Sequence, residues 1–174
     1  MTGSALYKAP FAPGGSNEID AQIAEKLLAV ALGKGADYAD LFFEYRAAGG
    51  LVFDEGILKS ASRGVTMGLG VRAQKGDATG YAYVEELTWD AMKRAAETAA
   101  QIATGGGAAT PAPIAPRDPS PVQRYELERV TLDVPGVDKR AILERAAAKA
   151  HAVDPRIVKV QASFAEEIRE ILRS

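Results

Sequence analysis

The chain has 174 residues, a net charge of -2, a single histidine and no cysteine. Without cysteine it forms no disulfide and holds no Cys-ligated zinc, and His151 alone cannot supply two histidine ligands from one helix. The near-balanced charge predicts no broad positive surface and therefore no direct nucleic-acid partner. Apolar runs such as 24–32 are too short to cross a bilayer, and residues 1–18 have no secretory signal core. The sequence therefore predicts a cytoplasmic protein without a membrane partner.

The first ordered element predicted from the sequence is a helix over residues 17–32. Residues 1–16 contain two prolines and a Gly-Gly pair without any sustained period, and we interpret them as a flexible N-terminal arm. Ser16 is a favourable N-cap, apolar residues then recur at helical spacing, and Gly33 ends the pattern.

The next part of the chain changes to the period of two that is typical of strands. The predicted extended segments are 41–46, 51–53, 57–63, 65–71 and 78–84. We expect Gly49-Gly50 and Gly64 to interrupt them. Short turns at 54–56 and 75–77 predict an antiparallel meander, because parallel strands need longer crossovers.

A second helix is predicted to begin at the N-cap Thr88 and to bury Met92, several alanines and Ile102 on one face. It ends at a run of three glycines. Residues 105–121 are rich in proline and glycine and predict an extended surface linker.

Beyond the linker, the sequence predicts an extended segment at 125–134, a third helix at 137–152 and a strand at 157–164. The third helix should end before Pro155, because the residue before a proline avoids helical backbone angles.

The C-terminal tail is compatible with two structures. Apolar spacing favours a helix over 164–172, whereas Glu166-Glu167 can also form the turn of a hairpin whose second strand is 168–172. The predicted organisation is thus an arm at 1–16, an α/β core at 17–104, a linker at 105–121 and, at 122–174, a helix plus a terminal strand or hairpin that completes the same domain.

The segment Gly68-Leu-Gly70-Val-Arg72-Ala is similar to a dinucleotide-binding fingerprint, but that motif requires a strand-to-helix turn, and here the alternation continues as a strand. We interpret these glycines, with Gly64, Gly76 and Gly80, as a bare sheet face that a helix or another backbone can approach closely. Arg72 interrupts this face. It is either a group that holds a carboxylate or peptide carbonyl, or an exposed strand arginine.

The remaining polar residues predict no catalytic or metal site in this chain. His151 lies near the end of the third predicted helix, where it would interact favourably with the helix dipole. The adjacent carboxylates Asp54-Glu55 and Glu166-Glu167 are expected to be solvated turn residues.

Four blocks, in chain order, resemble the N-terminal domain of the TldD/PmbA family and are closer to its TldD branch. They are residues 35–44, 54–59, 68–72 and 79–83, followed by an alanine-rich helix. The resemblance implies an α/β domain from a family of zinc metalloproteases, also called modulators of DNA gyrase, that act on unfolded peptides together with a paralogous subunit.

In that family a His-Glu-x-x-x-His helix holds the zinc, and this sequence contains no such motif. The resemblance therefore carries over no catalytic residue and no cofactor to this chain, and it assigns zinc to the complete enzyme. It also favours the hairpin over the helix in the C-terminal tail.

The sequence thus predicts an α/β fold of the α+β type, with a twisted, largely antiparallel sheet packed by two or three helices. The function implied by the resemblance is the substrate-cleft and subunit-contact domain of a TldD-like metalloprotease, paired with an identical or paralogous subunit. The candidate substrate-binding residues are Gly68, Gly70, Arg72, Gly80 and Tyr81. The alternatives are a free-standing, non-enzymatic module that pairs with a separate catalytic subunit, and a fragment of a longer protein.

Overall fold

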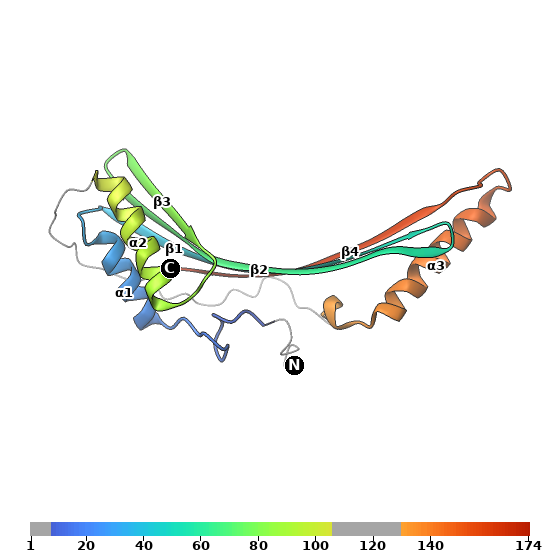
Figure 1. Ribbon diagram of the computed structural model, residues 1–174, viewed down its shortest axis with the longest axis horizontal. Helices are drawn as coiled ribbons and strands as arrows, with labels where there is room; N and C mark the ends of the chain where they lie inside the picture. Colours follow the sequence, from blue (N-terminus) through green and yellow to red (C-terminus); the bar gives the residue numbers. More distant parts are fainter. Residues whose placement is uncertain (1–7, 106–129) are drawn as a thin grey trace. The chain divides into compact units, whose positions relative to one another are not determined.

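The computed structural model describes residues 8–105 and 130–174. The expected arm up to residue 7, the linker from residue 106 and the extended segment up to residue 129 lie outside these described residues. The helices are α1 (Ala21–Leu32), α2 (Trp89–Thr104), α3 (Gly136–Val153) and a 3₁₀ turn at Thr131–Asp133; the strands are β1 (Tyr38–Asp54), β2 (Ile57–Lys75), β3 (Ala78–Val84) and β4 (Gln161–Arg173). The strands form one antiparallel sheet in the order β3-β2-β1-β4, so the predicted α+β class is confirmed (Figure 1).

The described residues divide into two compact units. The β3 unit contains residues 8–45, 66–105 and 170–174, and the α3 unit contains residues 46–65 and 130–169. Strands β1, β2 and β4 each contribute to both units. Within the described residues, no helix is long and apolar enough to cross a membrane.

Helix α1 of the β3 unit begins later than predicted. Its N-cap is Asp20, whose carboxylate accepts a hydrogen bond of 2.8 Å from the backbone N–H of Ile23, so the expectation of a cap at Ser16 was wrong. The residues before it fold back instead, because the N–H of Asn17 donates to the Pro10 carbonyl at 2.9 Å.

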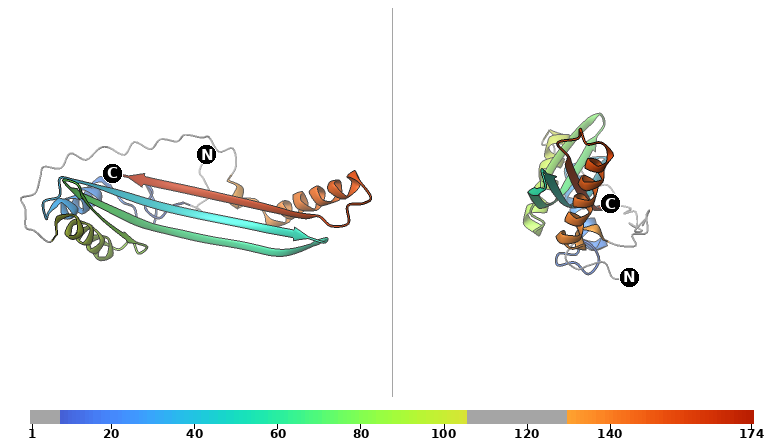
Figure 2. Two further views of the ribbon diagram at one scale, coloured as in Figure 1. Left: turned by 90° about the horizontal axis from the view of Figure 1, so that it is seen from above. Right: turned by 90° about the vertical axis from the view of Figure 1, so that its right-hand side faces the viewer.

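Helices α1 and α2 pack against each other, and α2 packs on β3 (Figures 1 and 2). Alternate residues of β1 and β2 point into this layer, as the period of two requires. The largest fully buried side chains of this core are Phe11, Leu27, Leu41, Phe43, Leu69 and Val71. The rings of Phe11 and Phe43 lie 5.7 Å apart between centroids.

Helix α2 contacts the sheet through its alanines. Thr88 is the N-cap residue as predicted, but its hydroxyl donates to Glu86 at 3.0 Å and accepts no capping hydrogen bond from a backbone N–H. Ala99 and its alanine neighbours are buried, whereas Ile102 is 55% exposed, which corrects the predicted helical face. Small side chains let the helix approach the sheet closely, and the bulkier Ile102 lies outside that contact.

Strands β1 and β2 are continuous where the sequence predicted interruptions. Gly49-Gly50 lies inside β1 and Gly64 lies inside β2. A Cβ atom at Gly49 would stand 3.0 Å from the carboxylate of Glu166, so this glycine makes room for a side chain and does not break the strand. The hairpin turns fall at Glu55-Gly56 and Gly76, all with positive φ, which confirms the predicted meander.

The α3 unit confirms the third helix, which spans Gly136–Val153 and ends before Asp154-Pro155. Its core consists of Phe53, Leu143 and Ala147, packed against Leu51, Val160, Ala162 and Phe164. Of the extended segment predicted at 125–134, the structure describes residues 130–134. Residues Thr131–Asp133 form the 3₁₀ turn instead of a strand, and Leu132 is buried there.

The C-terminal tail is a single strand, β4, so both the helix and the hairpin were wrong. Residues Gln161–Arg173 alternate between exposed and half-buried positions without interruption at Glu166-Glu167. In the β3 unit, the N–H and C=O groups of Leu41 and Ser174 bond each other reciprocally at 3.0 and 3.2 Å, which continues the antiparallel pairing to Ser174. Pairing along the sheet outweighs the helical spacing of this segment.

Candidate functional site

In the β3 unit, the face of the sheet opposite α2 carries most of the residues that the sequence singled out. We call it the outer face. It consists of Tyr38, Asp40, Phe42 and Glu44 from β1, Gly68, Gly70, Arg72 and Gln74 from β2, and Thr79, Tyr81 and Tyr83 from β3. Because side chains alternate along a strand, the residues between these positions face the helices.

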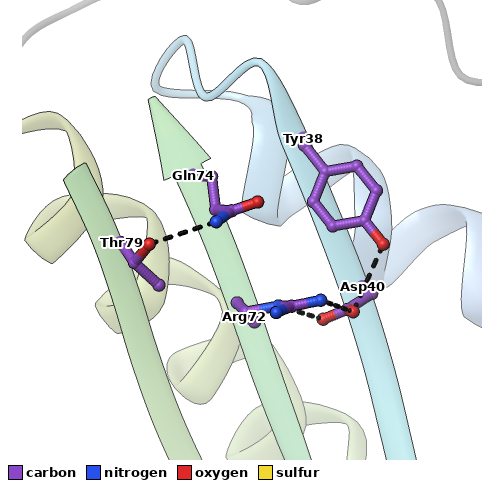
Figure 3. A network of polar contacts seen from close by, with 5 residues as sticks. All are labelled: Tyr38, Asp40, Arg72, Gln74 and Thr79. Carbon is purple, nitrogen blue, oxygen red and sulfur yellow. Dashed lines mark hydrogen bonds and ion pairs between the residues drawn. The ribbon is translucent and has the colours of Figure 1, made fainter. Parts of the chain in front are cut away.

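A polar network joins the three strands on this face (Figure 3). The guanidinium of Arg72 donates two hydrogen bonds to Asp40, at 3.1 Å from Nε and 2.5 Å from Nη2. It also lies over the ring of Tyr38, 5.7 Å from the centroid. Gln74 donates to the hydroxyl of Thr79 at 3.2 Å. Hydrogen bonding to Asp40, followed by the charge of Asp40, raises the pKa of Arg72.

Arg72 is therefore neither a simple exposed strand arginine nor a free carboxylate-binding group. The carboxylate that it holds belongs to its own sheet, and the side chain of that partner, Asp40, is only 16% exposed. This pair fixes β1 and β2 in register and orients the Tyr38 ring, whose hydroxyl donates to Asp40 at 3.3 Å.

Gly68 and Gly70 of β2 do not form the bare face that we expected, because tyrosines of β3 cover them. Tyr83 is registered opposite Gly70, and its ring reaches diagonally over Gly68. Tyr81 reaches over Gly70 in the same way, where an added Cβ atom would stand 2.6 Å from the phenol oxygen. Small residues on β2 thus seat large rings from β3.

Gly80 faces the opposite side of the sheet. An added Cβ atom there would collide with the backbone carbonyl of Ala99 in α2. As expected of a glycine, Gly80 lets another backbone approach closely, but that backbone belongs to helix α2 and not to a ligand. Four of the five predicted residues, namely Gly68, Gly70, Arg72 and Tyr81, share the outer face, and Gly80 does not.

Tyr83 is a member of the outer face that sequence reasoning missed. It is 55% exposed, and its hydroxyl donates to the Met67 carbonyl at 3.3 Å. Partial burial raises the pKa of Tyr83, and the negative charges of Glu85 and Glu44 raise it further. The alternation of Tyr81 and Tyr83 along the strand is the sequence signal that could have placed Tyr83 on the same face as Tyr81.

Residues outside the outer face offer no metal centre in the described part of the chain. No group of three His, Asp or Glu side chains is close enough there to hold a metal ion. The described residues therefore do not fit the zinc that the resemblance to the TldD/PmbA family implies. The Nδ1 atom of His151, at the end of α3, lies 3.0 Å from the Ile157 carbonyl, a contact that fastens the chain after the helix.

These features define an α+β domain with helices on one side of an antiparallel sheet and tyrosines on the other. Residues 39–103 match the family model of PmbA/TldA metallopeptidase domain 1. Over these residues the chain resembles the N-terminal domain of the PmbA/TldD family.

Individual relatives agree with this assignment. The chain is 30% identical to the metalloprotease TldD homolog of Haemophilus influenzae over 139 residues, which are 80% of this chain and 29% of that protein. A TldD homolog of Buchnera aphidicola is 26% identical over 78% of this chain and 28% of its own length. This chain thus spans less than a third of these relatives.

Solved structures show the same fold. A protein described as a modulator of DNA gyrase from Bacteroides thetaiotaomicron superposes with a TM-score of 0.65 at 12% identity, covering 94% of this chain and 37% of that one. TldE from Thermococcus kodakarensis gives a TM-score of 0.60 at 18% identity, covering 87% and 35% respectively.

Proposed function

We propose that this chain is the N-terminal domain of a TldD-like metalloprotease, and that it binds unfolded peptide segments and contacts another TldD/PmbA-type subunit, identical or paralogous. In this proposal the zinc and the hydrolytic chemistry belong to other residues of the complete enzyme, which acts in the cytoplasm. The family match to a metallopeptidase domain supports the assignment, as does the fraction of the TldD relatives that this chain spans.

The observation that carries peptide binding is the pair of exposed rings on the outer face. Tyr81 and Tyr83 are 59% and 55% exposed and project from the same side of β3. Tyrosine provides a large apolar surface with a polar end, so it contacts both side chains and backbone of an extended peptide without demanding one sequence.

The other predicted residues position the rings of this surface or the strand that carries them. Gly68 and Gly70 leave room for the rings, Arg72 holds the neighbouring Tyr38 through Asp40, and Gly80 lets α2 hold β3 from the opposite side. Among the five predicted residues we therefore propose Tyr81, beside Tyr83, as a contact residue and the other four as positioning residues.

Peptide binding is tested with fluorescein-labelled RNase A that has been reduced and carboxyamidomethylated, with native RNase A as the folded control. The anisotropy of the unfolded probe should rise when this chain is added, and that of the folded probe should not. Tyr81→Ala and Gly70→Val, which displaces the Tyr81 ring, should each weaken binding several-fold. Trp89→Ala, which removes an exposed aromatic residue on α2, should not. Equal binding of both forms of RNase A would refute the proposal.

The subunit contact is proposed for the sheet edge at β4. Among the strands of the described residues, β4 is paired on one side only, by β1. The free edge of a strand presents backbone donors and acceptors that another chain can pair with. Light scattering of this chain mixed with the paralogous subunit of the same organism should show the summed mass, and separate elution would contradict the contact.

A further inference from the structure

Helix α3 buries a short line of residues against the sheet. The line consists of Lys139, Leu143 and Ala147, spaced four apart along the helix, and we call it the docked line. Leu143 and Ala147 pack with Phe53 in the core of the α3 unit, whereas the third position of the line is a lysine. The docked line therefore contains one large apolar side chain.

A neighbouring line of the same helix is more apolar and remains outside. It consists of Ile142, Ala146 and Val153, with Lys149 between the last two, and we call it the flanking line. It is offset from the docked line by one residue, which turns it by about 100° around the helix axis. Ile142 and Val153 are 44% and 78% exposed. Burial of apolar surface alone therefore does not favour the face that is docked.

The lysine of the docked line distinguishes it from the flanking line. The Lys139 ammonium donates to Glu166 on β4 at 2.5 Å and lies 5.9 Å from the centroid of the Phe164 ring. Gly49 on β1 makes room for this carboxylate, because an added Cβ atom there would stand 3.0 Å from it. A rotation of α3 that buried the flanking line would carry the ammonium away from Glu166.

The pair has the properties of a selector more than those of a stabilising contact. The other oxygen of Glu166, Oε2, is buried without a hydrogen-bond partner among the described residues. Two buried charges with incomplete hydrogen bonding contribute little net stability, because desolvation offsets their attraction. Separating them, in contrast, leaves a buried charge uncompensated and is strongly unfavourable. The pair therefore adds little to the docked arrangement and penalises every arrangement that separates it.

The contacts at the two ends of α3 do not make this choice. Before the helix, the Arg63 side chain donates to the Leu132 carbonyl at 2.9 Å, and at its end His151 contacts the Ile157 carbonyl. Both carbonyls belong to the chain outside α3, so these contacts hold the segments on either side of the helix. The orientation of the helix between them depends on the docked line.

We infer that the Lys139–Glu166 pair is a conformational selector, which fixes the face of α3 that docks on the sheet and keeps the flanking line in solvent. Without the pair, α3 would divide its population between the two faces, because the flanking line is at least as apolar as the docked line. The selection is thus made by charge and not by the amount of apolar surface. The inference does not depend on the proposed function.

The test uses the absence of cysteine from this sequence, because a single introduced thiol then reports on one position. Ala147→Cys places the thiol on the docked line and Ala146→Cys places it on the flanking line, with little change in size. Maleimide labels an accessible thiol, and each rate is divided by the rate in urea, which removes differences in intrinsic reactivity. We expect Ala146→Cys to label about a hundredfold faster than Ala147→Cys.

The two thiols are then compared in Lys139→Ala/Glu166→Ala, which removes both charges and adds no large apolar side chain. We expect the labelling contrast to fall below about fivefold, with faster labelling at residue 147 and slower labelling at residue 146. The exchanged pair Lys139→Glu/Glu166→Lys should restore the contrast, because it restores the attraction. The matched control Arg140→Ala/Glu144→Ala, which removes an exposed pair of α3, should leave the contrast unchanged.

Each outcome decides the inference. A contrast that is unchanged in the alanine double variant would show that packing alone selects the face, and it would overturn the inference. Fast labelling at both positions of a chain that circular dichroism shows to be folded would also overturn it, because the pair would then hold α3 on the sheet without choosing a face. A contrast that the exchanged pair does not restore would contradict selection by charge. If the alanine variant does not fold, Lys139→Gln/Glu166→Gln, which keeps the side-chain lengths, is read in the same way.

Discussion

The guanidinium of Arg72 on β2 and the carboxylate of Asp40 on β1 form a two-point ion pair between residues 32 positions apart in the sequence. The side chain of Asp40 is the more buried partner, at 16% exposure against 42% for Arg72. Arg72 therefore supplies the hydrogen bonds that a poorly hydrated carboxylate needs. The pair also fixes the register of β1 and β2.

Arg72→Ala should lower the thermal midpoint of unfolding, because it leaves Asp40 without its partner and releases the Tyr38 ring. Arg72→Lys should recover part of the loss, since an ammonium cannot donate in the same two-point geometry. Arg140→Ala is the matched control, because it removes an exposed pair with Glu144 on α3. Equal midpoints for Arg72→Ala and Arg140→Ala would contradict a structural role for the pair.

Gly80→Ala should destabilise the β3 unit strongly, because the added methyl group collides with the Ala99 carbonyl and pushes α2 away from β3. We expect a loss of about 2 kcal/mol or more in the free energy of unfolding, measured with urea. The same substitution at Gly64, where a Cβ atom meets nothing within 4 Å, should change stability by less than about 0.5 kcal/mol. A mild effect at Gly80 would show that the helix can shift.

The α3 unit contains a buried ion pair between Lys139 on α3 and Glu166 on β4, at 2.5 Å and with side chains 5% and 6% exposed. The Lys139 ammonium also lies 5.9 Å from the centroid of the Phe164 ring. Glu166→Ala should lose about 3 kcal/mol of unfolding free energy, since it leaves a buried charge uncompensated.

The double variant Lys139→Met with Glu166→Leu tests the reason for that loss. Replacing both charges with apolar groups should recover most of the stability, because no buried charge is left unpaired. If the double variant is no more stable than Glu166→Ala, then packing around Gly49, where an added Cβ atom would stand 3.0 Å from Glu166, outweighs the charge effect.

Asp154, the residue at the end of α3, makes stability depend on acid pH. Hydrogen bonds from the Arg156 side chain and backbone hold the pKa of Asp154 below its ordinary value of 3.8. Because the folded-state pKa is the lower one, the contribution is present above the unfolded pKa and lost as the pH falls through the folded pKa. The thermal midpoint of Asp154→Asn should therefore fall less on acidification than that of the unaltered chain, and Arg156→Ala should reproduce this flattening.

The phenol of Tyr83 should ionise at higher pH than an ordinary tyrosine, first because it is partly buried and then because of Glu85 and Glu44. Phenolate absorbance followed during an alkaline titration, with Tyr83→Phe as the difference reference, isolates this group. Glu85→Gln should lower its pKa, and an unchanged titration would show that the carboxylate does not act on the ring.

The helices and hairpins of this fold were predictable because their signals are local. The third helix follows from its apolar spacing and from Pro155, and the meander follows from the turn residues at Gly56 and Gly76. The resemblance of residues 35–83 to the TldD/PmbA family needed only residue types in order. Each of these inferences uses neighbours within one turn or one strand.

The predictions that were wrong depend on contacts between residues far apart in the sequence. Gly49 looks like a strand break until Glu166 is placed beside it, and the tail looks helical until Leu41 pairs with Ser174. The candidate site shows the same division. The sequence indicated Gly68 and Gly70, but strand register determines that tyrosine rings cover them.

Residue order alone indicates the resemblance to the TldD/PmbA family, the antiparallel meander and the absence of a zinc motif in this sequence. Folding decides which groups meet: Arg72 with Asp40, α2 with Gly80, and the Tyr83 ring with Gly68. The reason is that backbone propensity acts over a few residues, whereas pairing between strands selects partners over the whole chain, and its register depends on every side chain that the sheet must bury.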